Sequence, residues 1–176
     1  MRDQPLRPVV EEVLSLLRST LPAGVEISRS LADAALEVHA DATQLSQVLM
    51  NLCTNAWHAL GGNAGRIKIG LAEVALDAQA VQQLEGLVPG HYARLSVSDN
   101  GCGMEQAMLE RIFEPFFTTK GVDQGTGLGL AVVHGIVMSH QGAIKVASEP
   151  SKGSTFEVYL PLVAARAPAI SSAAPN

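Results

Sequence analysis

Apolar residues recur with helical spacing near the beginning of the chain, in the segment PVVEEVLSLLRSTL that starts at Pro8. Proline suits the first turn of a helix, because the N–H groups of that turn have no partner inside the helix. The expected apolar face consists of Val9, Val10, Val13, Leu14, Leu16 and Leu17. Leu-Pro-Ala-Gly at 21–24 ends this helix. Val25 and Ile27 then alternate with polar residues as in a half-buried strand, and a loop is expected from there to Asp41.

A second helix is expected from Asp41 to about Leu60. Asp41 followed three residues later by Gln44 is a capping-box pattern, and the glycines at 61–62 stop the helix. One side of this helix is apolar and consists of Leu45, Val48, Leu52, Ala56 and Ala59.

Residues 66–71 and 92–98 alternate as a pair of strands, and the long excursion between them is expected to hold about one helical turn. A third helix is predicted after Gly127, and Gly142 ends it. Its helical spacing includes Leu128, Ala131, Val132, Gly135, Ile136 and Ser139.

Residues 143–147 and 155–160 are expected to form a final hairpin. The order of elements predicts an α/β two-layer sandwich, in which a mixed sheet of about five strands carries three main helices on one face. The domain is expected to span residues 1–162, and residues 163–176 read as an Ala/Pro/Ser-rich tail or linker.

Composition narrows the class of partner. The 176-residue chain has a formal net charge of -5, whereas a nucleic-acid surface needs clustered Lys and Arg, so no nucleic acid is expected. The apolar runs are too short to span a bilayer, so no membrane contact by this domain is expected, although a parent protein could be membrane-anchored. Cys53 and Cys102 lack metal-binding spacing, and their interpretation as reduced thiols predicts a cytoplasmic domain.

Three amides lie four residues apart on the second predicted helix: Gln47, Asn51 and Asn55. A solvated helix face would explain this stripe. However, Asn is a poor helix former, and two in consecutive turns cost stability without a compensating bond. An Asn carbonyl oxygen also suits Mg²⁺, a cation that proteins usually share with nucleotide phosphates. The stripe is therefore either a solvated face or part of a metal and nucleotide site.

Two glycine-rich segments follow. DNGCGM, which begins at Asp99 after a predicted strand, is either a plain turn or a carboxylate fixed at a strand end, with glycines that let a flat ligand approach. GTGLGL at 125–130 leads into the third helix, whose N-terminal amides and dipole favour an anion such as phosphate. A flexible cap is the alternative. This second segment matches neither a Walker A loop nor a dinucleotide fingerprint.

Between these segments, RIFEPFFTTK at 111–120 holds three of the four Phe residues in the chain. Ordinary core packing would account for them. A loop with an apolar centre and flanking glycines also fits a lid over a ligand, and such a lid is expected to span residues 105–124.

In this order, the segments resemble the histidine kinase branch of the GHKL ATPase superfamily, which has the Bergerat ATP-binding fold. DATQLSQVLMNLCTNAWHAL resembles its N box, DNGCGM its first glycine box, FEPFFTTK its F box, GTGLGL its second glycine box and GSTF its last short motif. Their joint occurrence is far more specific than any one motif, and the resemblance covers residues 6–162. It implies a protein histidine kinase domain that binds Mg-ATP in two-component signal transduction.

The resemblance also implies roles for single residues. Asn51 would bind Mg²⁺, and Asn55 would help to hold the nucleotide. Gln47 stands where the family often has Glu, but Gln cannot take a proton at neutral pH, so its catalytic role would be positioning. His58 would lie on the phosphate side, with an exposed helix residue as the alternative. Asp99 would accept a hydrogen bond from the adenine amine.

Gly101 and Gly103 would let the adenine ring lie against the backbone, and Thr155 would complete that end of the site. Lys120 is a candidate phosphate contact, with a solvated lysine as the alternative. The backbone amides that would surround the phosphates are those of Thr126, Gly127, Leu128, Gly129 and Leu130.

No histidine of the chain has the acidic neighbour that normally follows the phosphoacceptor of the family. His39, His58, His91, His134 and His140 are followed by Ala, Ala, Tyr, Gly and Gln. The acceptor is therefore expected on a dimerisation domain outside this chain, with a response regulator as an indirect partner, and His134 and His140 are expected to be structural. Two alternatives stay open: a GHKL serine or protein kinase of the anti-sigma type, and a non-catalytic nucleotide-sensing module.

Overall fold

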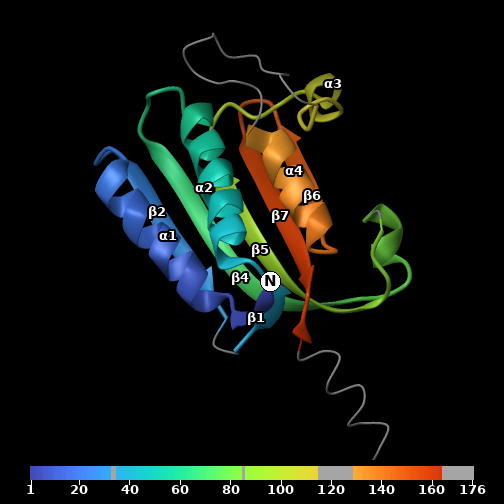
Figure 1. The fold of residues 1–176 in the computed structure, drawn as a ribbon. Helices are drawn as coiled ribbons and strands as arrows, with labels where there is room; N and C mark the ends of the chain where they lie inside the picture. The colour runs from blue at the N-terminus through green and yellow to red at the C-terminus, as the bar shows by residue number, and fades with distance from the viewer. Residues whose placement is uncertain (33–34, 85, 115–128, 164–176) are drawn as a thin grey trace, which may run out of the picture.

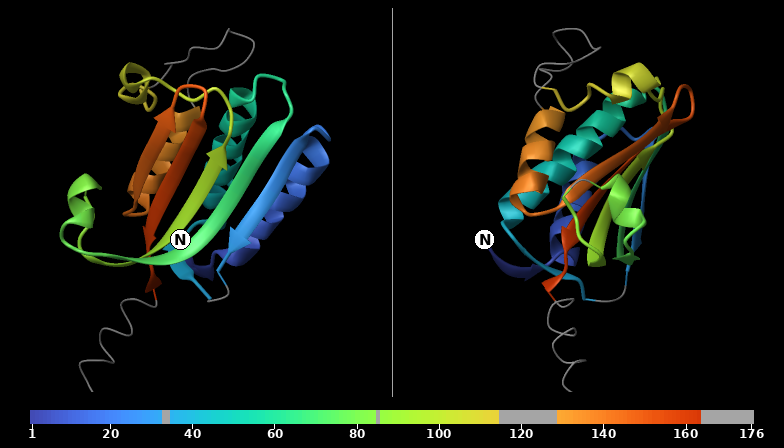
Figure 2. Two further views of the ribbon diagram at one scale, coloured as in Figure 1. Left: turned by 180° about the vertical axis from the view of Figure 1, so that it is seen from behind. Right: turned by 90° about the vertical axis from the view of Figure 1, so that its right-hand side faces the viewer.

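The computed structural model describes residues 1–32, 35–84, 86–114 and 129–163. These residues fold into two layers, a five-stranded sheet and three main helices that cover one of its faces (Figure 1, Figure 2). The helices are α1 (Arg7–Thr20), α2 (Ala42–Ala59) and α4 (Gly129–Ser139). The predicted two-layer α/β sandwich is therefore confirmed.

The sheet has the strand order β2-β4-β5-β7-β6. Its members are β2 (Val25–Leu31), β4 (Gly65–Leu76), β5 (Gly90–Asp99), β6 (Ala143–Glu149) and β7 (Gly153–Pro161). Strand β2 is parallel to β4 and all other neighbours are antiparallel, so the sheet is mixed, as predicted. The central pair β4–β5 and the hairpin β6–β7 correspond to the strand pairs predicted from alternation.

The core lies between the sheet and the helices, where α1 and α2 bury their apolar faces against the strands. On α1, five of the six predicted core residues are buried, and Leu16 is not, because it is 49% exposed. Successive helical residues are about 100° apart, so Leu16 points away from the face that Leu14 and Leu17 share.

Helix α4 buries Val133, Ile136 and Val137. Of the positions in its predicted spacing, Val132, Gly135 and Ser139 are exposed. The side chains of α4 itself are apolar or small on nearly all sides of the helix, so their spacing alone does not identify the face that packs. The helix predicted from this spacing and its end before Gly142 are confirmed, and among the described positions of that spacing Ile136 is the one that the core buries.

Two short strands were not predicted. β1 (Arg2–Pro5) and β3 (Glu37–Ala40) pair in antiparallel orientation, and an isolated bridge joins Val38 to Leu162 after β7. The prediction of a loop up to Asp41 is therefore partly wrong, because β3 lies within it. Strands of four residues are too short for alternation to be distinguished from a loop.

The connection between β4 and β5 contains a 3-10 turn, η1 (Ala80–Gln83), where about one helical turn was predicted. After this turn, Leu84 packs with Tyr92, Ala143 and Tyr159 in a second, smaller apolar cluster. Because side chains alternate along a strand, this cluster lies on the sheet face opposite the helices.

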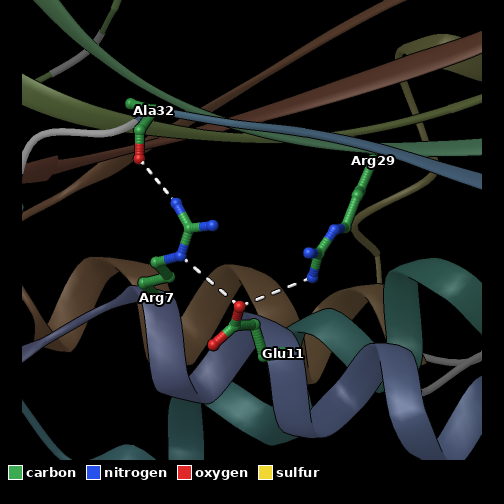
Figure 3. Close-up of polar contacts among 4 residues, drawn as sticks. All are labelled: Arg7, Glu11, Arg29 and Ala32. Carbon is green, nitrogen blue, oxygen red and sulfur yellow. Dashed lines mark hydrogen bonds and ion pairs between the residues drawn. The ribbon is translucent and has the colours of Figure 1, made fainter.

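Helix α1 is attached to the edge strand β2 by exposed polar contacts (Figure 3). Arg7 donates a hydrogen bond to the carbonyl oxygen of Ala32 at 2.9 Å, and the Glu11 carboxylate lies 3.4 Å from both Arg7 and Arg29. Exposed ion pairs contribute at most about 1 kcal/mol each, so these contacts add little to the stability of the fold.

No helix in the described part of the chain is long and apolar enough to cross a membrane. The predicted tail lies outside the described residues except for Val163. The domain bounds 1–162 stay a prediction.

Candidate functional site

Asp99 is fixed at the end of β5. Its carboxylate accepts a hydrogen bond from the N–H of Gly101 at 2.8 Å, and the residue is only 9% exposed. A buried carboxylate costs free energy unless polar groups accompany it, and the Gly101 N–H is such a group. A carboxylate fixed in this way can accept a hydrogen bond from a ligand at the strand end. The end of β5 lies at the same end of the molecule as the beginning of α4 (Figure 1).

The strand register decides which side chains accompany Asp99. Side chains alternate between the two faces of a strand, so Asp99 shares the helix-covered face with its cross-strand partner Ser154, which is 5% exposed. Thr155 pairs with Ser98 on the opposite face, where their hydroxyl oxygens lie 3.0 Å apart. The motif GSTF offers two neighbouring hydroxyls, and only the register distinguishes them. The structure brings Ser154, which was missed, to the side of Asp99 where Thr155 was predicted.

Gly101 and Gly103 lie where the backbone closely approaches other elements. A Cβ atom would stand 2.4 Å from the Ala59 carbonyl oxygen at Gly101, and 1.8 Å from the Glu149 carbonyl oxygen at Gly103. Gly103 also has a φ of +68°, in the region that favours glycine. Packing of this glycine segment between α2 and the β6–β7 turn therefore requires both glycines, whether or not a ligand lies against them.

Ser148 on β6 holds the same segment. Its hydroxyl accepts a hydrogen bond from the N–H of Met104 at 2.8 Å, and it lies 2.8 Å from the Ser154 hydroxyl and 3.0 Å from the Gly153 carbonyl oxygen. No sequence pattern singles out Ser148, because an isolated serine in a strand has no spacing signal. The hydroxyl nevertheless links the segment after Asp99 to both strands of the hairpin.

The predicted amide stripe lies on the side of α2 that the core does not bury. Gln47 is exposed, whereas Asn51, Asn55 and His58 are half-buried. The ring of His58 stacks on that of Trp57, with centroids 5.7 Å apart. The stripe therefore extends along α2 toward Ala59, the residue against which the Asp99 segment packs.

Asn51 connects this stripe to α4, because its amide nitrogen donates a hydrogen bond to the Gly129 carbonyl oxygen at 3.3 Å. Its amide oxygen remains as an acceptor. A neutral oxygen fits Mg²⁺, which takes few protein ligands and shares its other positions with phosphates and water. The described residues contain no group of three or more His, Cys, Asp or Glu side chains that could hold a metal. A cation at Asn51 would therefore depend on phosphate ligands.

Several predicted phosphate contacts, namely Lys120, Thr126, Gly127 and Leu128, lie outside the described residues. Gly129 and Leu130 form the beginning of α4. The expected lid is described only to residue 114 and begins with the short helix α3 (Gln106–Leu109). Ile112 is buried, and the Phe113 ring contacts the His134 ring at 5.5 Å, so this part of the Phe-rich segment packs against the core.

Neither cysteine forms a disulfide, as predicted. Burial raises the pKa of the Cys53 thiol to about 12, so it stays neutral at physiological pH, whereas Cys102 is exposed.

Three histidines outside the site have structural contacts. His39 lies 2.7 Å from Asp3 and His91 lies 3.4 Å from Glu73. His140 is buried at the end of α4, in agreement with its predicted structural role.

Comparison with known proteins supports the resemblance. Residues 40–164 match the family described as histidine kinase-, DNA gyrase B-, and HSP90-like ATPases. The signal transduction histidine-protein kinase AtoS of Escherichia coli is 37% identical over 158 residues, which are 89% of this chain and 23% of AtoS. The sensor histidine kinase ZraS of Escherichia coli is 41% identical over 78% of this chain and 26% of ZraS. The chain thus covers only a small part of the length of these relatives.

Solved structures agree. The catalytic domain of histidine kinase ThkA superposes with a TM-score of 0.73 at 30% identity, covering 90% of this chain and 93% of that domain. ThkA has also been solved in complex with the response regulator TrrA (TM-score 0.68, 27% identity, 90% and 41% covered). Full-length ShkA, solved in complex with AMPPNP, superposes with a TM-score of 0.71 at 26% identity. The superposition covers 91% of this chain and 31% of ShkA.

This chain therefore belongs to the family of histidine kinase-, DNA gyrase B-, and HSP90-like ATPases, a class of nucleotide-binding domains. Within the family, the relatives and structures named above are histidine kinases, as the sequence motifs predicted.

Proposed function

We propose that this domain binds Mg-ATP between α2, the end of β5 and the beginning of α4, and supplies the γ-phosphoryl group to a histidine on a separate dimerisation domain. The observation that carries the proposal is the buried Asp99 carboxylate at the end of β5, with the amide stripe of α2 extending from this region to Gly129. Such a layout offers one end for a base and another for phosphates. ShkA, to which the chain is similar, has been solved in complex with AMPPNP, which supports nucleotide binding by this domain.

At the adenine end, Asp99 accepts a hydrogen bond from the exocyclic amine of the base. Ser154 takes the place of Thr155 as the accompanying hydroxyl, because it shares the face of Asp99. Gly101 and Gly103 keep the following segment close to α2 and the β6–β7 turn, so that the carboxylate stays fixed before a ligand arrives.

At the phosphate end, the side-chain oxygen of Asn51 would hold Mg²⁺, which would supply positive charge beside the phosphates. Asn55 and His58 lie further along the stripe and contact the nucleotide, and Gln47 positions the reacting groups. The first turn of α4 presents backbone amides and the positive end of the helix dipole to the phosphates. The remaining contacts proposed for this end are Lys120, Thr126, Gly127, Leu128, Gly129 and Leu130.

Phosphoryl transfer depends on placement and on neutralised charge, so a domain of this kind needs an acceptor that docks in line with the γ-phosphate. Within this chain, no histidine has the acidic neighbour that normally follows the phosphoacceptor of the family, and His140 is also buried. The acceptor histidine is therefore assigned to a dimerisation domain, and the phosphoryl group then passes to a response regulator, a partner class seen with ThkA. The domain acts in the cytoplasm, where ATP is available.

A labelled-ATP assay with and without an added dimerisation domain tests the proposal. The purified chain alone is expected to bind Mg-ATP and to remain unlabelled. Adding the dimerisation domain should give acid-labile phosphate on that domain, in proportion to its concentration, because the covalent link that raises effective concentration is absent.

The other outcomes identify the alternatives. Acid-stable phosphate on a serine-containing substrate would favour a kinase of the anti-sigma type. Nucleotide binding without transfer to any acceptor would favour a sensing module. Rapid acid-labile labelling of the chain alone would refute the assignment of the acceptor to another domain.

A further inference from the structure

His140 is a buried polar residue that the proposed nucleotide chemistry does not use. It is 5% exposed and directly follows the last residue of α4. Its Nδ1 lies 2.8 Å from the Ile136 carbonyl oxygen, which can only accept, so Nδ1 carries the proton. Nε2 of the neutral ring is then an acceptor, and the backbone N–H of Asp41 donates to it at 3.1 Å.

Asp41 is the N-cap of α2. Its carboxylate accepts hydrogen bonds from the N–H groups of Thr43 and Gln44 at 2.9 and 3.2 Å. In a full capping box, the side chain of Gln44 would accept from the N–H of Asp41 itself. Here the acceptor is His140, so a residue at the end of α4 completes the cap of α2.

Among the hydrogen bonds of the described residues, two link α2 and its cap to α4, one at each end of α4. Asn51 meets Gly129 in the first turn, and Asp41 meets His140 after the last turn. The 11 residues of α4 span about 16 Å, so a tilt of about 4° around its last turn would move Gly129 by about 1 Å. Displacements of this size are large enough to weaken recognition and transfer.

We propose that His140 is a positioning residue for the phosphate end of the nucleotide site. It acts through the Asp41 N–H to set the tilt of α4 against α2, and thereby the distance of Gly129 from Asn51. This inference rests on the proposed function. The Asp99 end is held by strands, turns and the last residue of α2, and none of the hydrogen bonds of His140 given above reaches it, so the effect is confined to phosphate recognition.

Two substitutions of similar size separate positioning from general packing. In His140→Asn, the amide stands at the distance of Nδ1, so it can still donate to the Ile136 carbonyl but cannot reach Asp41. In His140→Gln, the amide oxygen reaches as far as Nε2 and can accept from Asp41. Calorimetry would measure Kd for Mg-ATP and for adenosine with each chain, and thermal unfolding would verify that each is folded.

His140→Asn should weaken the binding of Mg-ATP roughly five- to tenfold more than the binding of adenosine. This difference is the effect of about one net hydrogen bond. His140→Gln should restore most of the affinity. Equal losses for the two ligands, or equal losses in the two variants, would overturn the inference. If the unmodified chain binds no ATP, the proposed function fails and this inference fails with it.

A measurement on the unmodified chain covers the case in which His140→Asn does not fold. Coupling between two sites is reciprocal, so Mg-ATP should slow amide exchange at Asp41 more than saturating adenosine does. Equal exchange at Asp41 with the two ligands would contradict a link between this contact and the phosphate end.

Discussion

At the Asp99 end of the proposed site, several hydrogen bonds hold the glycine segment in place. Asp99 accepts from Gly101, the carbonyl of Ala59 accepts from Cys102 at 2.9 Å, and Ser148 accepts from Met104. At the other end, α2 meets the first turn of α4 through the bond between Asn51 and Gly129, which at 3.3 Å is longer than each of these. The base end is held by the sheet, its turns and the last residue of α2, whereas the phosphate end depends on how two helices pack against each other.

This difference has a functional meaning. A base end that is fixed before binding gives selectivity with little ordering cost. A phosphate end formed by two helices can shift when the helices tilt, so it is the more adjustable part of the site. Adenosine and Mg-ATP therefore serve as separate probes of the two ends, because in the proposed site only Mg-ATP extends to α4.

The largest expected effect is that of Asp99→Asn, which exchanges the charged acceptor for an amide. Losing a hydrogen bond to a charged group should weaken both adenosine and Mg-ATP roughly 10- to 100-fold, measured by calorimetry. Asp3→Asn, an exposed change on β1, is the matched control and should leave both affinities unchanged. Unchanged adenosine binding in a folded Asp99→Asn chain would show that Asp99 does not bind the base.

Asn51→Ala should act on the other end. Loss of the metal ligand is expected to weaken Mg-ATP on the order of tenfold while adenosine binding stays the same. Asn51→Asp keeps an oxygen ligand and should retain the dependence of binding on Mg²⁺. Equal losses of affinity for adenosine and Mg-ATP would contradict a role limited to the phosphate end, since Asn51 would then support the whole fold.

The smallest effect is expected for Ser148→Ala, which leaves the N–H of Met104 without its partner. Adenosine and Mg-ATP should both weaken about fivefold, because the segment after Asp99 becomes less ordered. Ser148→Thr keeps the hydroxyl and should bind almost normally. A loss of affinity confined to Mg-ATP would show that Ser148 acts on the phosphate end and not on the base end.

The sequence predicted the elements whose signals are local and long. Helix α2 has a capping residue and four turns of apolar spacing, and the pair β4–β5 alternates over many residues. Asp99 could be found because glycines follow it directly after an alternating strand. Each of these features depends on residues that are close together in the chain.

What was missed depends on residues that are distant in the chain. The proposal of Ser154 in place of Thr155 rests on the register between β5 and β7, and Ser148 meets Met104 only because β6 lies beside the segment that follows Asp99. Likewise, the acceptor that completes the cap at Asp41 comes from His140, so a capping-box pattern read within one helix names the wrong partner.

Cys53 lies at 0% exposure on the inner side of α2, and its thiol has a pKa near 12. Alkylating reagents attack the thiolate and need access to it, so this sulfur is silent while α2 remains packed on the sheet. Cys102, which is exposed, reacts at once and can be replaced in advance. In a chain without Cys102, the rate of Cys53 alkylation measures how often α2 separates from the sheet. A bound nucleotide should lower that rate, because it stabilises the folded state.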